Sequence, residues 1–587
     1  MGATYSDDQP ANHPVLGPAA RSVWGKSDRD SEDWLPLYRH MSDSGAVAVL
    51  LWDRWLPSGV RTLVAGGTTE DEHAVARRLV GWLATAHDLG KATPAFAMQV
   101  TPLADGMHRQ GLTMTARRGD SVLVRHATAS HLLLRRWLLD QVGMEGDIAD
   151  TYAVVVGGHH GVPPSTLALE VATNRPELTG RGNWEAVQRE LADYAASEAG
   201  VADDLRSRHH QSLDVRAQVL VTALVIMADW LASNRDLFPW VDRSSGADRA
   251  ERALADIGLP PAWQSTIEPG ADIHQLMRDR FELPDDTMAR PVQQTVLELA
   301  RTVDEPGLII VEAPMGEGKT EAALLAAEVL AQRTGAGGCF IALPTMATSD
   351  AMFTRVLAWA RHLPGNQQMS TFLAHGKAAL NEDAADLRHA GRVRGVAQDD
   401  PDGPGAGSVV AVQWLASRKK GVLSNLVVGT IDQLLVGALK SRHLVLRHLA
   451  LAGKVVVIDE AHAADQYMAQ YLDRALEWLG AYRVPTVVLS ATLPSDRRVA
   501  MVAAYETGRR TTSAANASPD GSGSALSFRR RGAVVSSATD PYSGLRGDIG
   551  YPVVTATTSS APTRRICEPS GRATVVRVDR LADDDAA

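Results

Sequence analysis

The chain has 587 residues, of which 45% are hydrophobic and 22% are charged, and its formal net charge is −10. This length and composition predict a folded protein of about three to four domains and exclude an intrinsically disordered chain. The acidic balance does not by itself favour binding to nucleic acid, although a basic cleft on an acidic body is compatible with it.

Cysteine content and hydropathy limit the possible compartments. The sequence holds two cysteines, Cys339 and Cys567, so neither a disulfide framework nor a thiolate zinc site is expected, and the cytoplasm is the predicted location. The N-terminal stretch MGATYSDDQPANHP is polar and lacks the apolar core of a signal peptide. Apolar runs such as VLVTALVIMADWLA end after about a dozen residues, too few to span a bilayer, and no membrane partner is expected.

The first half of the chain reads mainly as helices. Residues 1–30 are rich in Pro, Asp and Ser and are expected to be flexible. The segments HAVARRLVGWLATAHDLG, ATASHLLLRRWLLDQV and DVRAQVLVTALVIMADWLASN carry apolar residues at helical spacing. They predict an all-α domain at 31–240, and a connecting helical segment is expected at 241–289.

The pattern changes near residue 290. Short β-branched runs, among them GLIIVEAP, KVVVIDEA and TVVLSAT, alternate with helical stretches and end in small or polar residues. This alternation predicts an α/β lobe with a parallel sheet over 290–505. An irregular loop is expected at 393–408. Residues 506–587 contain low-complexity sequence and are expected to form a linker and an incomplete C-terminal segment.

The segment APMGEGKT follows a predicted strand and precedes a predicted helix. It fits the phosphate-loop pattern, except that Ala313 replaces the first glycine. Gly316 and Gly318 would let backbone N–H groups approach the phosphates. Lys319 would reach the β- and γ-phosphates, and the Thr320 hydroxyl would bind Mg²⁺. The flanking strand and helix disfavour a plain glycine-rich turn, so ATP with Mg²⁺ is the predicted ligand.

A second strand, VVVIDEAH, would deliver two carboxylates at its end. Asp459 would hold Mg²⁺ through water, and Glu460 would polarise the attacking water. A strand that ends in Asp-Glu is common as a solvated edge. The phosphate loop before it and the SAT triplet at 490–492 after it favour the catalytic interpretation.

The phosphate loop, DEAH and SAT together resemble the first RecA-like lobe of superfamily-two helicases. The resemblance implies that Gln293, in RPVQ, reads adenine and that three residues couple the motifs: His462, Ser490 and Thr492. The segments LPTMATSDAMFTR and VVGTIDQLL are similar to those that grip the nucleic-acid backbone, which gives four candidate contacts: Thr345, Arg355, Thr430 and Gln433. Taken alone, Thr and Gln on loops are as readily helix caps.

The resemblance also implies a second motor lobe, whose arginines stabilise the transferring phosphoryl group. No QxxGRxxR-like stretch follows Thr492, and about 95 residues remain there, fewer than the ~150 that a lobe requires. We therefore expect a motor that is cut short in this chain. It would bind ATP but would hydrolyse it and translocate poorly unless a second chain completes it.

The helical half carries histidines and aspartates in the order H…HD…D, which resembles the metal ligands of HD-type phosphohydrolases. His40, then His87 with Asp88, then Asp229 supply this order. Asp229 lies in an otherwise apolar helix, where a carboxylate is costly unless a metal or a donor pairs with it. The alternative is an aspartate on an exposed stripe near the end of the helix.

Further histidines would form a second metal position: His126 in VRHATAS, and His159 with His160 in GGHHG. Imidazoles and carboxylates together suit Mn²⁺, Fe²⁺, Co²⁺ or Ni²⁺ better than Ca²⁺, and Mg²⁺ is a further candidate. Two such ions would clamp a phosphodiester and activate water for in-line attack.

Lys91 lies one helical turn beyond Asp88 and would neutralise a non-bridging phosphate oxygen. His87, Asp88 and Lys91 are therefore the predicted catalytic residues of the helical domain. His131 is expected to be a packed or surface histidine, and the pair at 209–210 has charged neighbours that indicate a solvated face.

An HD domain followed in one chain by a DEAH motor lobe resembles the Cas-three nuclease–helicases of type I CRISPR interference. The motifs HDLGKATPAF, GGHHG, ADWLASN, RPVQ, APMGEGKTEA, LPTMATSDAMF and VGTIDQLL occur in this order across about residues 24–495, and subtype E is the most similar branch. The resemblance implies a metal-dependent endonuclease and exonuclease for single-stranded DNA, coupled to an ATP-dependent helicase. It further implies antiviral defence on the R-loop that an RNA-guided surveillance complex opens.

Three other functions stay open at this level. One is an HD hydrolase of small nucleotides, which would release phosphate or nucleoside without cutting DNA. A second is a superfamily-two helicase with a structural HD domain, in which replacing His87 and Asp88 by alanine would leave ATPase activity intact. The third is a non-catalytic remnant that only docks on the surveillance complex.

Overall fold

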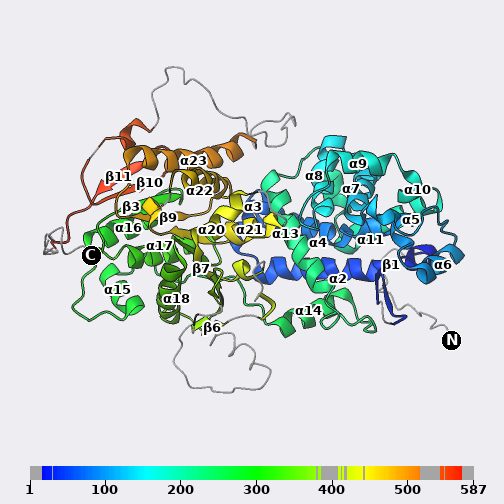
Figure 1. Ribbon diagram of the computed structural model, residues 1–587, viewed down its shortest axis with the longest axis horizontal. Helices are drawn as coiled ribbons and strands as arrows, with labels where there is room; N and C mark the ends of the chain where they lie inside the picture. The colour runs from blue at the N-terminus through cyan, green and yellow to red at the C-terminus, as the bar shows by residue number, and fades with distance from the viewer. Residues whose placement is uncertain are drawn as a thin grey trace, which may run out of the picture.

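The computed structural model describes residues 16–28, 31–365, 367–378, 381, 383–384, 408–410, 413–415, 420–439, 443–463, 465–515, 542–547 and 549–571. Parts of three predicted segments lie outside these residues: 1–15 of the flexible lead-in, 393–407 of the irregular loop and 516–541 of the linker. Figure 1 shows two bodies along the long axis, a helical body in blue to cyan-green and an α/β lobe in green to red.

The helical body confirms the all-α domain predicted from periodicity. Its helices bury apolar faces against one another, and α4 begins at a capping box in which Thr69 and Glu72 satisfy each other's backbone N–H groups. The helices are α1 (Pro18–Arg21), α2 (Leu37–Leu50), α3 (Ser58–Ala65), α4 (Glu70–Ala86), α5 (Pro94–Ala97), α6 (Thr101–Arg109), α7 (His126–Trp137), α8 (Gly146–Gly157), α9 (Thr166–Thr173), α10 (Pro176–Thr179), α11 (Asn183–Ala199), α12 (Ala202–Ser207), α13 (Val215–Ala232) and α14 (Gly246–Ile257).

The limits of the helical body differ from the predicted 31–240. A short antiparallel hairpin of β1 (Trp24–Ser27) and β2 (Trp34–Pro36) precedes α2 and belongs to this body. After it, α14 packs on α2, whereas α15 (Ile273–Phe281) packs on helices of the lobe. The segment expected to connect the domains therefore divides between them, because each of its helices buries its apolar face on a different body.

The lobe contains the predicted parallel sheet. Strands β3 to β9 pair in parallel, in the order β3-β9-β8-β4-β7-β5-β6, and the five central strands are buried along their whole length. Burial on both faces explains their continuous Val, Ile and Leu content. These strands are β3 (Leu308–Glu312), β4 (Cys339–Leu343), β5 (Gln368–Ala374), β6 (Ser408–Val410), β7 (Leu426–Thr430), β8 (Val455–Ile458) and β9 (Thr486–Ser490).

Helices cover both faces of this sheet, as Figure 1 shows. The parallel connections require such crossover helices, and several of them contact strands of the sheet directly. The helices of the lobe are α15, α16 (Pro291–Thr302), α17 (Lys319–Thr334), α18 (Met346–Arg361), α20 (Ile431–Leu435), α21 (Leu444–Ala452), α22 (Gln466–Ala481) and α23 (Ser495–Ala515).

The C-terminal segment is more ordered than its composition predicts. Helix α23 runs past the expected boundary at residue 505, and two strands extend the sheet, β10 (Val553–Ala556) and β11 (Thr563–Ile566). Strand β10 pairs antiparallel with β3, with Val554 opposite Val311. Within 506–587, where a linker and an incomplete C-terminal segment are expected, these two strands belong to the sheet of the lobe. The low-complexity run that separates them from the lobe in sequence concealed a pairing that is only apparent in three dimensions.

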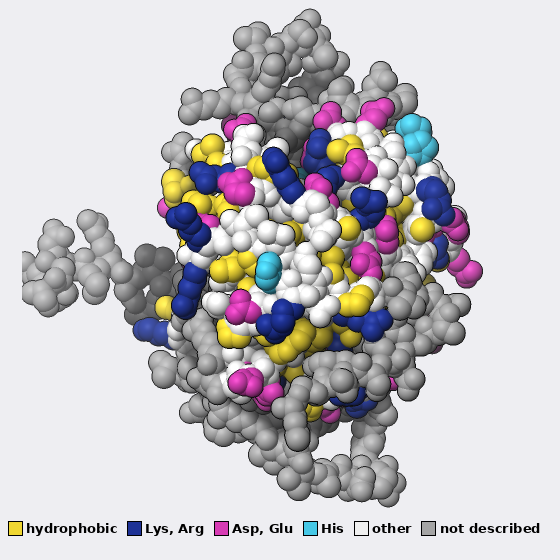
Figure 2. Space-filling view, turned by 90° about the vertical axis from the view of Figure 1, so that its right-hand side faces the viewer, with side chains coloured by type: hydrophobic (Ala, Val, Ile, Leu, Met, Phe, Trp, Pro, Cys, Tyr) yellow, Lys and Arg dark blue, Asp and Glu magenta, His cyan; other side chains and the backbone are white. Residues whose placement is uncertain are grey.

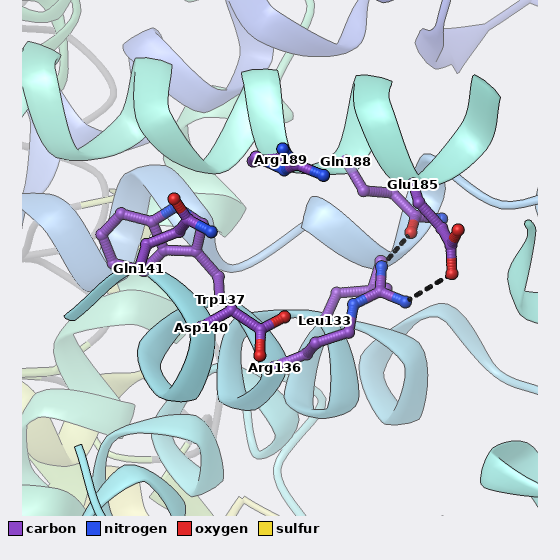
Figure 3. A pocket seen from close by; sticks show the side chains of 8 residues that line it. All are labelled: Leu133, Arg136, Trp137, Asp140, Gln141, Glu185, Gln188 and Arg189. Carbon is purple, nitrogen blue, oxygen red and sulfur yellow. Dashed lines mark hydrogen bonds and ion pairs between the residues drawn. The ribbon is translucent and has the colours of Figure 1, made fainter. Parts of the chain in front are cut away.

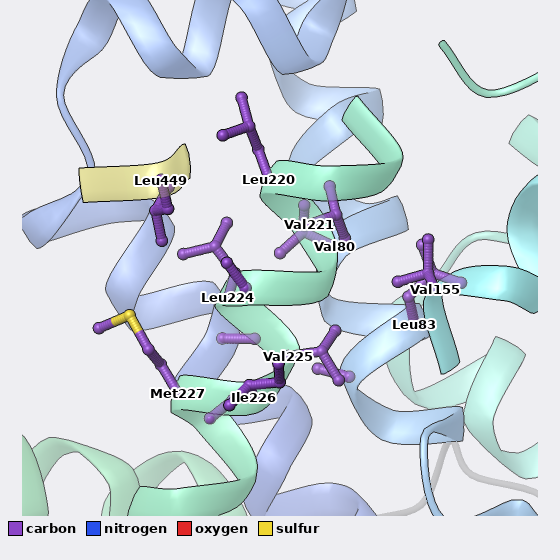
Figure 4. Close-up of a cluster of buried hydrophobic side chains, with 14 of the residues drawn as sticks. Val80, Leu83, Val155, Leu220, Val221, Leu224, Val225, Ile226, Met227 and Leu449 are labelled. Carbon is purple, nitrogen blue, oxygen red and sulfur yellow. The ribbon is translucent and has the colours of Figure 1, made fainter. Parts of the chain in front are cut away.

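Helix α13 lies between the two bodies. Its Leu220, Leu224 and Met227 lie beside Leu449 of α21 in the lobe, while Val80 of α4 lies on another side of it (Figure 4). By length and hydropathy alone, α13 could cross a membrane, and it is the one described helix that meets this test. However, 78% of it is buried inside the protein, which is how a core helix shared by two domains behaves.

Candidate metal centre and nucleotide site

The first set of candidate ligands comes from α2, the end of α4 and α13. One ligand atom from each of its four buried residues lies within 4.8 Å of the others: His40, His87, Asp88 and Asp229. His40 Nε2 lies 3.2 Å from Asp88 Oδ2 and 3.3 Å from Asp229 Oδ1. His87 Nε2 lies 3.3 Å and 3.5 Å from the same two oxygens. The H…HD…D residues meet at one point, and Asp229 is buried rather than on an exposed stripe.

The second set also forms. The ligand atoms of His126, His159 and His160 lie within 4.8 Å of one another, at the start of α7 and in the turn after α8. Asp88 Oδ1 lies 3.5 Å from His126 Nε2 and 3.6 Å from His159 Nε2. Asp88 thus turns Oδ2 toward the first set and Oδ1 toward the second, which is the arrangement of a carboxylate that bridges two cations.

Backbone carbonyls fix the orientation of two ligand rings. His87 Nδ1 lies 2.7 Å from the carbonyl oxygen of Ala84, and His159 Nδ1 lies 2.5 Å from that of Val156. A neutral imidazole that donates from Nδ1 carries its lone pair on Nε2, and in both rings Nε2 faces the cluster. The helical turn before each histidine therefore sets the tautomer that a metal ligand needs.

A close helix contact brings His126 to Asp88. Gly90 lies against the first turn of α7, where a Cβ would come within 2.0 Å of the His126 carbonyl oxygen. The backbone N–H of Gly90 donates to Ser130 Oγ at 2.8 Å. Glycine in HDLGK is therefore required for α7 to approach the HD turn, and this approach places the second set beside the first.

The two carboxylates are ionised in a buried environment. Burial alone would raise the pKa of Asp88, but Lys91 and His87 hold it well below its usual range. Burial likewise opposes ionisation of Asp229, yet contacts with His40 and His87 keep its pKa well below the usual value. Burial disfavours protonated His87, but Asp88 and Asp229 raise its pKa to about 9. Asp88 and Asp229 therefore stay ionised and can bind cations, and His87 would release its proton when a metal binds it.

The histidines of the second set are neutral. Burial lowers the pKa of His126 to about 3, and it also lowers the pKa of His159 and His160. Neutral imidazole is the form that binds a metal.

The donor set fits divalent cations. Among the described residues, the buried Nε2 atoms of His40, His87 and His159 have no hydrogen-bond partner, although they point into the cluster. Buried imidazole nitrogens without partners are costly unless something binds them. Imidazole nitrogens and carboxylate oxygens together suit transition-metal ions such as Mn²⁺ or Ni²⁺. The described residues can thus supply two adjoining cation positions.

Two residues near the centre have no signal in the H…HD…D pattern. Lys26 Nζ lies 3.6 Å from Asp229 Oδ1 and donates to Ser233 Oγ at 2.7 Å. Ser233 in turn donates to Asp229 at 2.8 Å. The serine lies four residues after Asp229 in ADWLASN, so helical spacing could have indicated it, whereas Lys26 comes from β1 and could not be inferred.

The other histidines lie elsewhere, as predicted. His131 Nε2 lies 3.2 Å from Asp150 Oδ1 and belongs to neither ligand set. His209 and His210 contact each other at 3.6 Å between ring centroids and also lie outside both sets.

The phosphate loop joins β3 to α17. Gly316 and Gly318 have left-handed backbones, with φ of +84° and +73°, as a loop of exposed N–H groups requires. Lys319 Nζ donates to the carbonyl oxygens of Ala313 and Pro314 at 2.7 Å and 3.1 Å, so it spans the loop. Ala313, which replaces the first glycine of the usual pattern, is buried, and its backbone N–H donates to the Ser490 carbonyl oxygen at 3.2 Å.

Gln293 lies next to this loop, as expected of an adenine-reading glutamine. Its Nε2 donates to the Gly318 carbonyl oxygen at 3.2 Å, and its Oε1 accepts from the backbone N–H of Arg290 at 2.8 Å. The side chain of Arg290 contacts the Gly316 carbonyl oxygen, a contact that sequence reasoning missed. Thr320 follows Lys319 at the start of α17.

The acidic pair follows β8 and lies near Lys319. Burial and the adjacent Glu460 raise the pKa of Asp459, and both carboxylates act on Lys319, whose pKa burial lowers. Glu460 has a left-handed backbone with φ of +52°, and its Oε2 lies 3.2 Å from His462 Nδ1. Strained backbone of this kind is frequent at functional sites.

The three residues expected to couple the motifs are in contact. His462 Nδ1 lies 3.3 Å from Ser490 Oγ, and Ser490 Oγ donates to the Thr492 carbonyl oxygen at 2.6 Å. DEAH and SAT are therefore connected through side chains, with Glu460 at one end.

The four candidate nucleic-acid contacts are engaged within the lobe. Thr345 caps α18 by accepting from the Thr348 backbone N–H at 3.2 Å. Arg355 pairs with Glu321. Gln433 Oε1 accepts from Arg447 at 3.0 Å. Thr430 ends β7 and precedes α20. Their role toward nucleic acid stays a prediction.

A cavity of about 250 Å³ lies between α7 and α11, apart from both sites. Arg136 crosses it to reach Gln188 at 2.6 Å and Glu185 at 3.4 Å, as Figure 3 shows. Gln188 is buried and donates to the Ala92 carbonyl oxygen at 2.7 Å, just after the HDLGK turn. None of the candidate ligands lines this cavity. The contacts of Arg136 and Gln188 support the HDLGK turn rather than the metal centre itself.

Figure 2 views the end of the molecule formed by the helical body. On the described part of this face, Lys and Arg side chains alternate with Asp and Glu, and neither sign dominates an area. A continuous basic patch for nucleic acid is therefore not visible among the described residues from this side.

The fold and the two sites define a class: an HD-type phosphohydrolase domain joined to a superfamily-two helicase lobe. Residues 24–238 match the family described as Cas3, HD domain. A "CRISPR-associated nuclease/helicase Cas3" of Streptococcus thermophilus is 35% identical over 512 residues, covering 83% of this chain and 53% of that protein. The chain is thus a homologue of the Cas3 nuclease/helicases over most of its length.

Two solved structures support this relationship. T. fusca Cas3-ATP superposes with a TM-score of 0.72 at 30% identity and covers 94% of this chain and 56% of that one. A chain of a "CRISPR RNA-guided surveillance complex, pre-nicking" gives a TM-score of 0.62 at 27% identity and covers 94% and 54%. The chain spans about half the length of the relatives it matches.

Proposed function

We propose that the chain is a metal-dependent endonuclease and exonuclease for single-stranded DNA, joined to the ATP-binding lobe of a helicase motor. The observation that carries the proposal is the position of Asp88, whose two oxygens face two separate sets of ligands. Two adjoining cation positions are the arrangement that in-line cleavage of a phosphodiester uses. The homology to Cas3 nuclease/helicases supports the same activity.

The chain's own residues prepare the site for this chemistry. When bound, divalent cations would act as Lewis acids on the phosphodiester and promote attack by water. His87 and His159 present Nε2 because carbonyl oxygens hold Nδ1. Asp88 and Asp229 supply the negative charge that retains cations. Lys91 Nζ lies 2.6 Å from Asp88 Oδ2, and Lys91 is the residue we propose to face a phosphate oxygen of the substrate.

The lobe is proposed to bind ATP with Mg²⁺ and to act as part of a DNA helicase. Lys319, Asp459 and Glu460 lie close enough to interact electrostatically, as phosphate and Mg²⁺ binding requires. The similarity of this lobe to T. fusca Cas3-ATP supports the same ligand. Catalysis of hydrolysis would need arginines from a second lobe, in the same protein or in a partner chain.

The proposed setting is CRISPR type I antiviral defence in the cytoplasm. The structural match to a chain of an RNA-guided surveillance complex supports recruitment to DNA that such a complex has opened. Both cysteines are free and buried, which is compatible with a reducing compartment.

The test is cleavage of circular single-stranded DNA by the purified chain, stripped with EDTA and supplied with Mn²⁺ or Ni²⁺ but without ATP. Cleavage that requires the metal is expected. Release of phosphate or nucleoside from small nucleotides, with the circle left intact, would instead indicate a nucleotide hydrolase. ATPase activity without any cleavage would indicate a helicase with a structural HD domain.

A further inference from the structure

His443 of the P-loop lobe contacts a residue next to a candidate ligand in each of the two sets. It precedes α21 and has a left-handed backbone with φ of +62°. Its backbone N–H donates to the Gly161 carbonyl oxygen at 3.2 Å, and Gly161 follows the ligand His160. Its ring lies edge-on to Trp230 at 5.5 Å between centroids, and Trp230 follows the ligand Asp229.

The turn that carries His159 and His160 is shaped to this contact. Gly161 has φ of +91°, and a Cβ there would lie 2.4 Å from His443 Nδ1 and 2.8 Å from the His443 backbone nitrogen. Only a residue without a side chain lets the lobe approach this closely. The glycine after the histidine pair therefore serves the contact between domains as well as the turn.

The lobe also holds Trp230 through a second residue. Lys420 Nζ lies 5.5 Å from the Trp230 ring centroid and 4.4 Å from that of Trp414. Partial burial of Lys420 lowers its pKa, and a desolvated ammonium strengthens such cation–π contacts. The end of α13, which carries Asp229, is thus fixed by the lobe from two directions.

We propose that His443 is a positioning residue for the metal centre, acting through Gly161 on the second ligand set and through Trp230 on the first. The ligands all belong to the helical domain, but the lobe completes their geometry. This inference rests on the proposed metal-dependent function. Mutation of a residue that orients a metal ligand typically lowers metal affinity or activity by about 10- to 100-fold, and we expect an effect of this size.

The test is Mn²⁺ binding to the EDTA-stripped full chain, measured by EPR of free Mn²⁺, for wild type and His443→Gly. Glycine keeps the left-handed backbone and its N–H but removes the ring. The apparent affinity is expected to fall about tenfold. ATP-independent cleavage should fall at limiting Mn²⁺ and recover at saturating Mn²⁺.

Leu449→Ala is the matched control, because Leu449 lies in the same interface beside Leu224 and Met227 (Figure 4) and belongs to neither ligand set. It should lower the melting temperature and leave Mn²⁺ affinity unchanged. Wild-type affinity in His443→Gly, or an equal loss in Leu449→Ala, overturns the positioning role while the proposed function stands. If the wild type binds no Mn²⁺, the proposed function itself fails and this inference with it.

Discussion

Lys91 Nζ lies 2.6 Å from Asp88 Oδ2, and both side chains are buried. Lys91 also donates to the Gly25 carbonyl oxygen at 2.8 Å, which ties it to β1. The lysine thus compensates the negative charge of the carboxylate that lies between the two ligand sets. A cation bound at the centre would supply charge to the same carboxylate.

Replacing Lys91 by methionine removes the buried charge and keeps most of the stem. Breaking a buried pair by removing one partner costs about 3–5 kcal/mol, so Lys91→Met should melt well below the wild type in EDTA. Saturating Mn²⁺ should recover part of this loss, because the cations then neutralise Asp88. Differential scanning calorimetry with and without Mn²⁺ measures both effects.

Lys26→Met is the control for this experiment. Lys26 is more exposed and lies 3.6 Å from Asp229, so its loss should cost less than about 1 kcal/mol. If Lys91→Met melted equally far below the wild type in EDTA and in Mn²⁺, the carboxylate would not be a metal ligand.

The lobe contains its own buried pair at the end of β3. Glu312 and Arg498 of α23 are joined by two hydrogen bonds, of 2.6 Å and 2.8 Å. Glu312→Gln leaves the guanidinium without its counter-ion and should destabilise the lobe by about 3–5 kcal/mol. The double variant with Arg498→Met should regain part of this, because both charges are then removed. Thermal melting of the four proteins measures the coupling.

If the destabilisation of the double variant equalled the sum of the destabilisations of the two single variants, the two side chains would not stabilise the lobe as a pair. ATP-independent cleavage is expected to persist in Glu312→Gln at temperatures below its melting transition, since Glu312 touches no residue of the metal centre.

Asp43 of α2 gives a dependence of stability on pH. Burial outweighs the attraction of Arg249, 3.1 Å away, and raises the pKa of Asp43 to about 7. The folded state therefore binds this proton more tightly than the unfolded chain, whose carboxyl titrates near 4. The resulting stabilisation is complete below about pH 4 and is lost as the pH rises through about 7.

Asp43→Asn mimics the protonated form, so its melting temperature relative to the wild type should rise between pH 5 and pH 8. Melting curves of both proteins across this range check the prediction. A difference that stays constant over the range would contradict it, because Asp43 would then titrate alike in both states.

Lys319→Ala should separate the two halves of the chain. A hydrogen bond to a charged group contributes about 1.5–3 kcal/mol, so ATP affinity should fall by roughly 10- to 100-fold. ATP-independent cleavage should be unchanged, because Lys319 lies in the lobe and contacts no metal ligand. Lys377→Ala, an exposed lysine of the same lobe, should alter neither. Equal loss of both activities would show that nucleotide binding and cleavage are linked through Lys319.

Much of the centre could be predicted because its ligands follow a pattern of order and local context. His40, His87, Asp88 and Asp229 occur as H…HD…D, and the buried position of Asp229 follows from its apolar helix. The second set could be inferred from the glycines around His159 and His160. The parallel sheet could be predicted because each of its buried strands is a continuous apolar run.

The remainder depends on contacts between distant segments. The pairing of β10 with β3 follows about 240 residues of intervening chain and leaves no local signal. The contact of His443 with Gly161 likewise joins two domains, and although Gly161 ends the GGHHG motif, His443 belongs to none of the motifs. The spacing of Lys91 and Asp88 in the sequence is compatible with a contact between them. The burial of both side chains depends on tertiary packing, however, and could not be inferred from that spacing.

The bridging position of Asp88 is the central claim, and Asp88→Asn tests it most directly. Asparagine keeps the shape of the side chain but removes the charge that two cations would share. The measurement is the rate at which EDTA-stripped wild type and Asp88→Asn, each supplied with Mn²⁺ and no ATP, linearise circular single-stranded DNA. We predict a loss of at least about a thousandfold in the variant, since the site would no longer retain both ions. Cleavage by Asp88→Asn at the wild-type rate would contradict the account.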